Sequence, residues 1–269
     1  MKKIEKEELH RIQIGILDYF AEFCDNHELR YWIDYGTLLG AIRHRGYIPW
    51  DDDIDVSMLR KDYERLMDCF NREGMGRYQF LCPEKDRKYY YPFGKIVDTE
   101  TVLYEMGEKG LKIGVYIDVF VVDYAPDDDV KLRKIFGKRD FYGRLRRYQL
   151  PLGQAKISAK RIGVLGIQAI LKFVPRQYFA LKIIYNARKY THTETKRVCG
   201  MTDPYDKIHW VVSRKLFEDF CEVEFEGKKY HAPAKYDKWL KILYGDYMKL
   251  PSKEEQSAAQ HDIEAYYIE

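Results

Sequence analysis

The sequence lacks the features of a membrane-spanning, secreted or disulfide-stabilised protein. Its five cysteines are scattered over 269 residues without a C-x-x-C pair, which argues against a disulfide framework or a thiolate zinc site and favours a reducing cytoplasm. The longest apolar stretch, residues 162–174, is shorter than the roughly 18 residues that a membrane span needs, and it contains Gln168 and Lys172. Three glutamates interrupt the basic N-terminus, which makes it a poor signal peptide.

The chain also has little net charge, +3 from 46 basic and 43 acidic residues, so charge alone predicts no nucleic-acid binder. The distribution is uneven. Residues 131–200 hold 18 Lys and Arg against two acidic residues, a net charge of +16 that leaves −13 for the rest. This segment would recruit an anionic membrane face or polymer, although long helices also carry solvated lysines. No RNA-binding or zinc-finger spacing accompanies it, so we expect no nucleic-acid partner.

The order of helical and strand patterns predicts an α+β fold. With 46% hydrophobic residues, the chain can form a core without a disulfide or metal. An amphipathic helix opens the chain and ends near His27. Strands are expected at 31–35, 53–58, 78–81, 93–97 and 115–124, and helices at 37–42, 61–70 and 234–244. We expect one catalytic domain over 1–269, with a core sheet at about 29–125, a basic helical insertion at about 127–200 and a C-terminal segment at 201–269.

The most informative segment is the acidic strand that contains Asp53 and Asp55. One apolar residue separates them, so on a strand their carboxylates share one side and repel each other unless a cation lies between them. Asp118 is the lone charge in the otherwise apolar segment 114–122, where a buried carboxylate needs a partner. Oxygen ligands of this kind suit Mg²⁺ or Mn²⁺. An EF-hand calcium loop is excluded because Val56 stands where that loop needs glycine.

A turn upstream of the acidic strand offers a place for phosphate. Gly36 and Thr37 stand at a predicted strand-to-helix junction, which presents backbone N–H groups, a hydroxyl and a helix N-terminus. This pair is a weak signal alone, and an Asp-x-Asp pair also occurs in metal-dependent glycosyltransferases. Together, the turn and the acids favour phosphoryl transfer.

These motifs resemble the signature of the LicD family, relatives of the fukutin proteins in the nucleotidyltransferase-fold superfamily. The resemblance rests on segments spread over most of the chain: Gly36-Thr-Leu-Leu-Gly-Ala-Ile-Arg43, Ile48-Pro-Trp-Asp-Asp-Asp-Ile-Asp-Val56, Lys95-Ile-Val-Asp with Thr101, Ile117-Asp-Val-Phe120, Tyr244-Gly-Asp-Tyr-Met-Lys-Leu-Pro251 and His261. The basic middle region is the weakest match to it. The end departs from the family pattern where this chain reads Pro251-Ser-Lys-Glu-Glu-Gln256.

The resemblance implies a nucleotidyltransferase-like mixed sheet and a transfer of phosphocholine, or a similar alcohol phosphate. The donor would be a CDP-alcohol and the acceptor a hydroxyl of a cell-surface glycan, or of a teichoic-acid or lipopolysaccharide precursor, with CMP leaving. Asp53, Asp55 and Asp118 match the family's metal-binding acids, with Mg²⁺ or Mn²⁺ as the cofactor. Gly36 and Thr37 match the turn that holds phosphate.

Three further residues are candidates for substrate binding, each beside a structural alternative. Arg43 could pair with a donor phosphate or be a solvated helix residue. Lys95, a charge in an otherwise apolar strand, has a similar claim to a donor phosphate. Asp246, after Gly245, could contact the nucleotide or only cap a turn.

The sequence also predicts a location for the protein and leaves two alternatives to the transferase function. We expect a cytoplasmic protein whose residues 131–200 contact the anionic inner face of the membrane or hold an acidic acceptor chain. The alternatives to the transferase are an ordinary nucleotidyltransferase that uses a nucleoside triphosphate and a non-catalytic module that binds anionic polymers.

Overall fold

The computed structural model describes residues 1–73, 76–105, 112–150, 159–193, 195–202, 207–258 and 263–268. The helices are α1 (Lys6–Asn26), α2 (Tyr35–His44), α3 (Arg60–Glu73), α4 (Asp129–Tyr148), α5 (Ala159–Leu171), α6 (Gln177–Ala187), α7 (Tyr236–Tyr244) and α8 (Lys253–Ala258). The strands are β1 (Lys3–Ile4), β2 (Trp32–Ile33), β3 (Asp55–Leu59), β4 (Tyr78–Leu81), β5 (Gly94–Asp98), β6 (Thr101–Glu105), β7 (Lys112–Ile113), β8 (Tyr116–Ala125), β9 (Arg197–Gly200), β10 (Val212–Ser213), β11 (Phe220–Phe225), β12 (Lys228–Pro233) and β13 (Ile263–Tyr267).

A mixed sheet built around β8 organises the described residues. The first half of β8 has β3 as a parallel neighbour on one side and β5 as an antiparallel neighbour on the other. Further strands extend it to the order β10-β9-β8-β3-β2, with β4 beside β5. A second, antiparallel sheet has the order β1-β13-β6-β7, and β11 and β12 form a hairpin.

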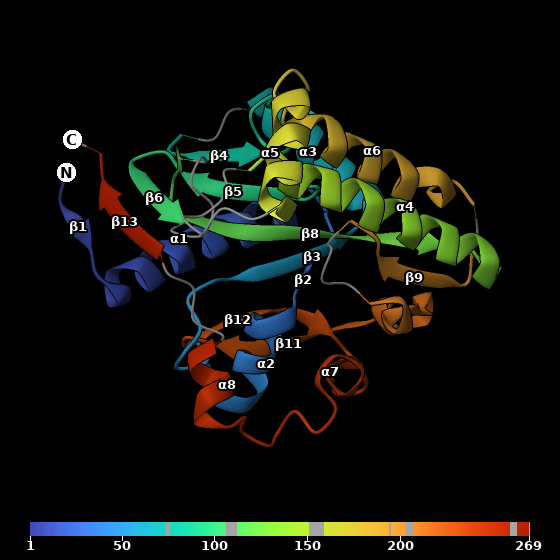
Figure 1. Cartoon of the computed structure of the whole chain (residues 1–269). Coiled ribbons are helices and arrows are strands. Elements are labelled where there is room, and N and C mark those ends of the chain that lie inside the picture. The colour runs from blue at the N-terminus through green and yellow to red at the C-terminus, as the bar shows by residue number, and fades with distance from the viewer. Residues whose placement is uncertain are drawn as a thin grey trace.

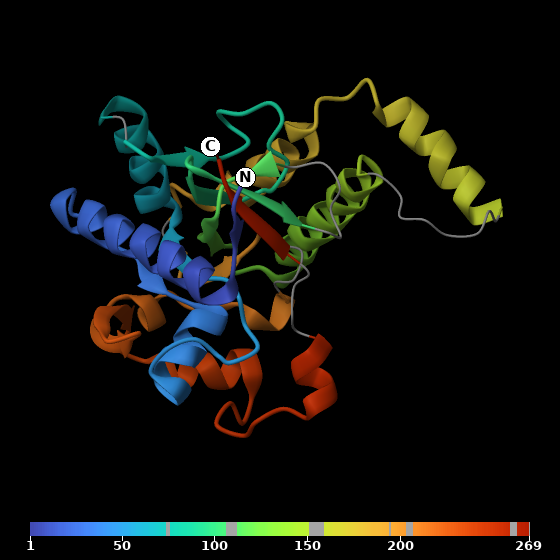
Figure 2. The same ribbon diagram turned by 90° about the vertical axis from the view of Figure 1, so that its left-hand side faces the viewer.

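Helices cover this sheet in distinct layers (Figure 1). α4 packs against α6 on one side, and α1 and α3 contact β8. On the other side of the molecule, α2 lies against the β11–β12 hairpin and α7. Turned by 90°, the molecule shows α5 projecting away from the body (Figure 2). Among the described residues, no helix combines the length and the apolar character that crossing a bilayer requires.

The first helix illustrates how the sequence pattern produces the core. In α1 the buried apolar residues recur at three- and four-residue steps, as expected for one face of a helix: Leu9, Ile12, Ile16, Phe20 and Phe23. They join the largest hydrophobic cluster together with strands β2, β3 and β8. A second cluster forms where α4 and α6 meet β8 and β9.

The predicted α+β class is confirmed, and so is the helical character of the basic region, which contains α4, α5 and α6. One detail of the acidic strand is wrong. β3 begins at Asp55, so Asp53 lies in the irregular segment before the strand rather than on it. The main sheet also extends beyond the expected 29–125, because β9 and β10 join it from residues 197–213.

A buried ion pair connects α3 to the central strand. Arg60 donates from Nε to Oδ1 of Asp123 at 2.8 Å and from Nη2 to Oδ2 at 2.9 Å. Both side chains are almost fully enclosed, at 1% and 0% exposure. Each charge therefore depends on the other for solvation.

We expect Asp123→Ala to lower the free energy of unfolding by about 3–5 kcal/mol, because it leaves the Arg60 guanidinium buried without its counter-ion. Urea denaturation monitored by circular dichroism measures this change. The matched control is Glu222→Ala, which removes an exposed ion pair with Lys229 and should change stability by less than about 1 kcal/mol. Equal losses in the two variants would contradict the prediction.

Candidate active site

The site is built where two parallel strands place acidic side chains at the same level. Asp55 is the first residue of β3, and its register partner on β8 is Asp118. The N–H of Asp118 donates to the carbonyl of Ile54 at 2.8 Å, which fixes the start of this pairing. Both aspartates are buried, at 8% and 7% exposure. The structure thus brings together two acids that are 63 positions apart in the chain.

The pKa of Asp55 reflects its burial and the carboxylates near it. Burial raises the pKa of Asp55 well above its usual value, and the carboxylates of Asp53 and Asp118 raise it further. Asp51 and Asp34 act in the same direction. A buried group surrounded by like charges favours a proton or a bound cation.

Lys95 supplies one positive charge to this group. It is the register partner of Asp118 on β5, and its Nζ lies 2.5 Å from Oδ1 of Asp118. The same Nζ lies 3.4 Å from the centre of the Tyr116 ring. At 2% exposure, the ammonium group is enclosed between a carboxylate and an aromatic face. The predicted substrate-binding lysine is therefore a partner of a predicted metal ligand.

The turn between β2 and α2 packs against the acidic segment. Gly36 allows this approach, since a Cβ atom at this position would lie 2.6 Å from Oδ2 of Asp51. The preceding residue, Tyr35, has a φ of 43°, a left-handed conformation that costs a residue with a side chain about 1–3 kcal/mol. Strain of this kind is concentrated at functional sites.

Asp34 holds this strained turn in place. It is the N-cap of α2, and its Oδ1 accepts hydrogen bonds from the N–H of Tyr35 at 2.9 Å and from Nε1 of Trp239 at 2.6 Å. Its Oδ2 accepts from Nε1 of Trp32 at 3.0 Å. Burial raises the pKa of Asp34, and these hydrogen bonds oppose that effect. The cap therefore links β2, α2 and α7 through one carboxylate.

Thr37 has a structural role beside the phosphate role that the sequence predicts. Its Oγ1 accepts a hydrogen bond from the backbone N–H of Asp55 at 2.8 Å. In return, the carbonyl of Asp55 accepts a hydrogen bond from the N–H of Asp34 at 3.0 Å. Because Oγ1 acts as an acceptor here, the hydroxyl proton is left to donate to another group. The backbone N–H and the carbonyl of Asp55 thus both bond to residues 34–37 at the start of α2.

Arg43 and Asp246 are both connected with the turn that follows α7. Nη1 of Arg43 donates to the carbonyl of Tyr247 at 2.8 Å, which ties α2 to the turn after α7. Asp246 is exposed in that turn, and its carbonyl accepts from the N–H of Lys249. Among the interactions of the described residues, Arg43 is held by the turn after α7, and neither it nor Asp246 is shown in contact with Asp55 or Asp118.

Tyr244, at the end of α7, was not among the predicted site residues. The residue is 42% exposed, yet its hydroxyl lies among packed atoms, and burial raises its pKa well above the usual value. The carboxylates of Asp55 and Asp34 raise it further. The sequence carried a signal for it, because this tyrosine directly precedes the Gly245-Asp246 turn that contributed to the family resemblance.

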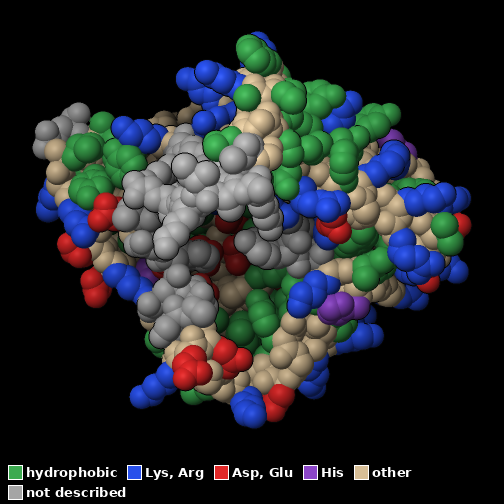
Figure 3. Space-filling view, in the orientation of Figure 1, with side chains coloured by type: hydrophobic (Ala, Val, Ile, Leu, Met, Phe, Trp, Pro, Cys, Tyr) green, Lys and Arg blue, Asp and Glu red, His purple; other side chains and the backbone are tan. Residues whose placement is uncertain are grey.

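The acids offer more than one arrangement for a cation. Asp51, Asp52 and Asp53 each place a carboxylate oxygen within 4.8 Å of the others, whereas Asp55 and Asp118 face each other across the strands. Acidic side chains lie in a hollow near the centre of the face in Figure 3. A buried set of carboxylate oxygens, with Asp55 strongly disfavoured as an anion, fits a hard divalent cation. His261, part of the sequence resemblance, lies outside the described residues.

We expect Thr37→Val to destabilise the protein by about 1–3 kcal/mol, because it leaves the buried N–H of Asp55 without an acceptor. Thr37→Ser keeps the hydroxyl and serves as the control, with a much smaller loss. Thermal and urea unfolding of the two variants measure the difference. If valine and serine were equally tolerated, the hydrogen bond would not be what holds the turn against β3.

Comparison with known proteins gives similarity over the whole chain. The sequence profile described as LicD/FKTN/FKRP, nucleotidyltransferase domain, matches residues 28–150. This range includes the turn and the three predicted metal-binding acids. Lipopolysaccharide cholinephosphotransferase LicD of Haemophilus influenzae is 32% identical over 275 residues, covering 100% of both chains.

Two eukaryotic proteins share shorter segments. Ribitol 5-phosphate transferase FKRP of Homo sapiens is 50% identical over 55 residues, which are 20% of this chain and 10% of that protein. Mannosyltransferase regulator 4 of Saccharomyces cerevisiae is 29% identical over 82 residues, 28% of this chain and 7% of that protein.

Proposed function

Since the chain belongs to the LicD family, we propose that it transfers phosphocholine, or a similar alcohol phosphate, from a CDP-activated donor to a glycan hydroxyl. The acceptor would be a lipopolysaccharide or teichoic-acid precursor, and CMP would leave. The observation that carries the proposal is the placement of Asp55 beside Asp118, with the carboxylate of Asp53 acting on Asp55, next to a helix N-terminus suited to phosphate. The full-length similarity to a cholinephosphotransferase supports phosphocholine as the first group to test.

In this reaction the acceptor oxygen forms a bond to the phosphorus that carries the alcohol, and the bond from that phosphorus to CMP breaks. The first turn of α2 would hold phosphate oxygens through its backbone N–H groups and the Thr37 hydroxyl. Lys95 keeps Asp118 in place through its ion pair. A carboxylate of the group would take the proton of the attacking hydroxyl.

Asp53, Asp55 and Asp118 are the residues that would hold Mg²⁺ or Mn²⁺. When bound, such an ion neutralises charge on the transferred and leaving phosphate oxygens. We also infer that the mixed sheet around β3 and β8 is a nucleotidyltransferase-like core, because the family profile that matches residues 28–150 is described as a nucleotidyltransferase domain.

We expect Asp55→Asn and Asp118→Asn each to lower transfer by more than about a hundredfold, because each removes a proposed cation ligand. Asp118→Asn also removes the counter-ion of buried Lys95 and should lower stability, so Asp55→Asn, in which that ion pair is kept, is the decisive variant. The assay measures CMP release from CDP-choline with a lipopolysaccharide or teichoic-acid acceptor, before and after treatment with a chelator. Asp68→Asn, at an exposed position of α3, is the matched control.

Two other outcomes would point elsewhere. Pyrophosphate release from CTP without CMP release from any CDP-alcohol would replace the proposal with an ordinary nucleotidyltransferase. Polymer binding without either reaction, unchanged in Asp55→Asn, would identify a binding module.

We further propose that the basic region contacts the anionic inner face of the cytoplasmic membrane. α5 projects from the body (Figure 2) and, with the residues that follow it, exposes apolar side chains, among them Ile170 at 72% and Phe173 at 87%. Exposed Lys172 lies between these two residues in the sequence. An apolar surface flanked by cations suits the boundary between headgroups and acyl chains. Such contact would bring the site close to a lipid-linked acceptor.

We expect the double variant Ile170→Ser and Phe173→Ser to bind vesicles that contain anionic lipid at least about tenfold more weakly, because it removes apolar surface from the contact. Co-sedimentation with vesicles of increasing phosphatidylglycerol content measures binding. Met248→Ser changes another exposed apolar residue, 57% exposed after α7, and serves as the control. Binding that needs no anionic lipid, or that persists at high salt, would contradict the contact.

A further inference from the structure

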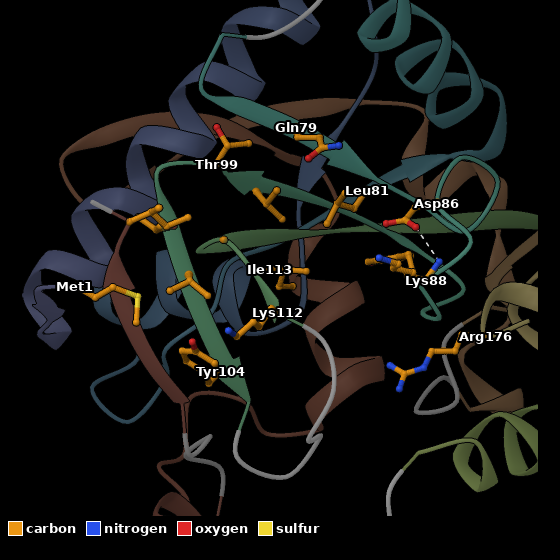
Figure 4. Close-up of a pocket in the computed structure, with 16 residues that line it drawn as sticks. Met1, Gln79, Leu81, Asp86, Lys88, Thr99, Tyr104, Lys112, Ile113 and Arg176 are labelled. Carbon is orange, nitrogen blue, oxygen red and sulfur yellow. Dashed lines mark hydrogen bonds between the residues drawn. The ribbon is translucent and has the colours of Figure 1, made fainter. Parts of the chain in front are cut away.

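A cavity lies where the main sheet meets the four-stranded sheet (Figure 4). Its volume is about 940 Å³, within the range of small-molecule binding sites. The walls come from β4, β5, β6 and β7, from the β4–β5 loop and from the residue that precedes α6. None of the predicted site residues lines it.

Strand register connects this cavity to the acidic group. Leu81 on β4 lines the cavity and is the partner of Lys95 on β5, which in turn is the partner of Asp118 on β8. Side chains of directly paired residues lie on the same face of a sheet. Neighbouring strands are about 4.8 Å apart, so Leu81 and Asp118 lie about 10 Å apart along this face. Lys95, which lies between these two residues, is enclosed at 2% exposure, so the side chains around it separate the cavity from the acidic group along this face.

The lining carries an excess of positive charge. Lys88, Lys112 and Arg176 reach the cavity from three separate segments, whereas Asp86 is the acidic residue in the lining. Oδ1 of Asp86 accepts a hydrogen bond from the backbone N–H of Lys88 at 2.7 Å. Among the described residues, neither Lys88 nor Lys112 forms an ion pair. Figure 4 places Lys112 and Arg176 on different sides of the cavity.

The rest of the lining suits a sugar. Tyr104 offers a ring, with Nζ of Lys112 5.3 Å from its centre. Gln79 and Thr99 add polar groups, and Leu81 and Val97 add apolar surface. Carbohydrate rings need such a mixture of an aromatic face and hydrogen-bonding side chains, and an anionic substituent would meet the cations.

We propose that this cavity binds an anionic sugar unit of the acceptor glycan, one that carries a phosphate or a carboxylate. Lys88, Lys112 and Arg176 recognise the anion, and the adjoining units of the same glycan lead around the side chains that cover Lys95 to the acidic group. This assignment rests on the proposed transferase function, and it names the substrate class that the same site takes.

Isothermal titration calorimetry with glucose 6-phosphate, glucuronate, glucose and inorganic phosphate tests the cavity directly. We expect the two anionic sugars to bind more tightly than glucose or inorganic phosphate, and Lys112→Gln to raise their dissociation constants about tenfold by removing a charged hydrogen-bond donor. Lys61→Gln, at an exposed position of α3, is the control and should change nothing. Inorganic phosphate binding as tightly as the sugar phosphate, or Lys112→Gln behaving like the control, would overturn the proposal.

A second measurement separates this proposal from the transferase function. With an anionic glycan acceptor, Lys112→Gln should raise the KM for the acceptor about tenfold while leaving kcat and the KM for CDP-choline unchanged. Unchanged acceptor KM in an active enzyme would overturn the cavity assignment alone. If the wild-type protein used no CDP-alcohol, the transferase function would fail, and the calorimetric result would still decide whether the cavity takes an anionic sugar.

Discussion

The parallel pairing of β3 with β8 is the constraint on which the site depends. It makes Asp55 and Asp118 register partners, so their carboxylates lie side by side. Burial and this proximity make the ionised form of Asp55 unfavourable, and Lys95 offsets part of the charge through Asp118. The negative charge that remains is an asset in a site for phosphate chemistry, because a divalent cation bound there gains from every nearby carboxylate.

The surroundings of the acids are held by hydrogen bonds that side chains make with the backbone. Thr37 binds the N–H of Asp55, and the carbonyl of Asp55 binds the N–H of Asp34. The Asp34 side chain then connects two indole rings from distant parts of the chain, Trp32 and Trp239. A strained residue such as Tyr35 persists only where its neighbours are fixed in this way.

Local patterns in the sequence predicted much of this fold, and long-range pairing accounts for the rest. The apolar spacing of residues 6–26 and the charge of Asp118 among apolar residues are visible in short sequence windows. The first segment forms the predicted helix and the second the predicted strand. The pairing of Lys95 with Asp118 depends on the register of β5 against β8, and a short stretch of sequence does not reveal how two distant strands align. Asp53 alternates with Asp55 as strand residues do, yet it lies outside β3, whose ladder with β8 starts at Asp55. The roles of these residues in catalysis remain predictions.

The position of β13 between β1 and β6 has a consequence for biosynthesis. Lys3 pairs with Tyr266, so β1 must wait for β13 to be synthesised before it can pair. At about 5–20 residues per second, that wait exceeds ~10 s. Throughout it, β6 (Thr101–Glu105) presents an open edge to other chains in the cell. The small sheet is therefore completed only after β13 has been synthesised.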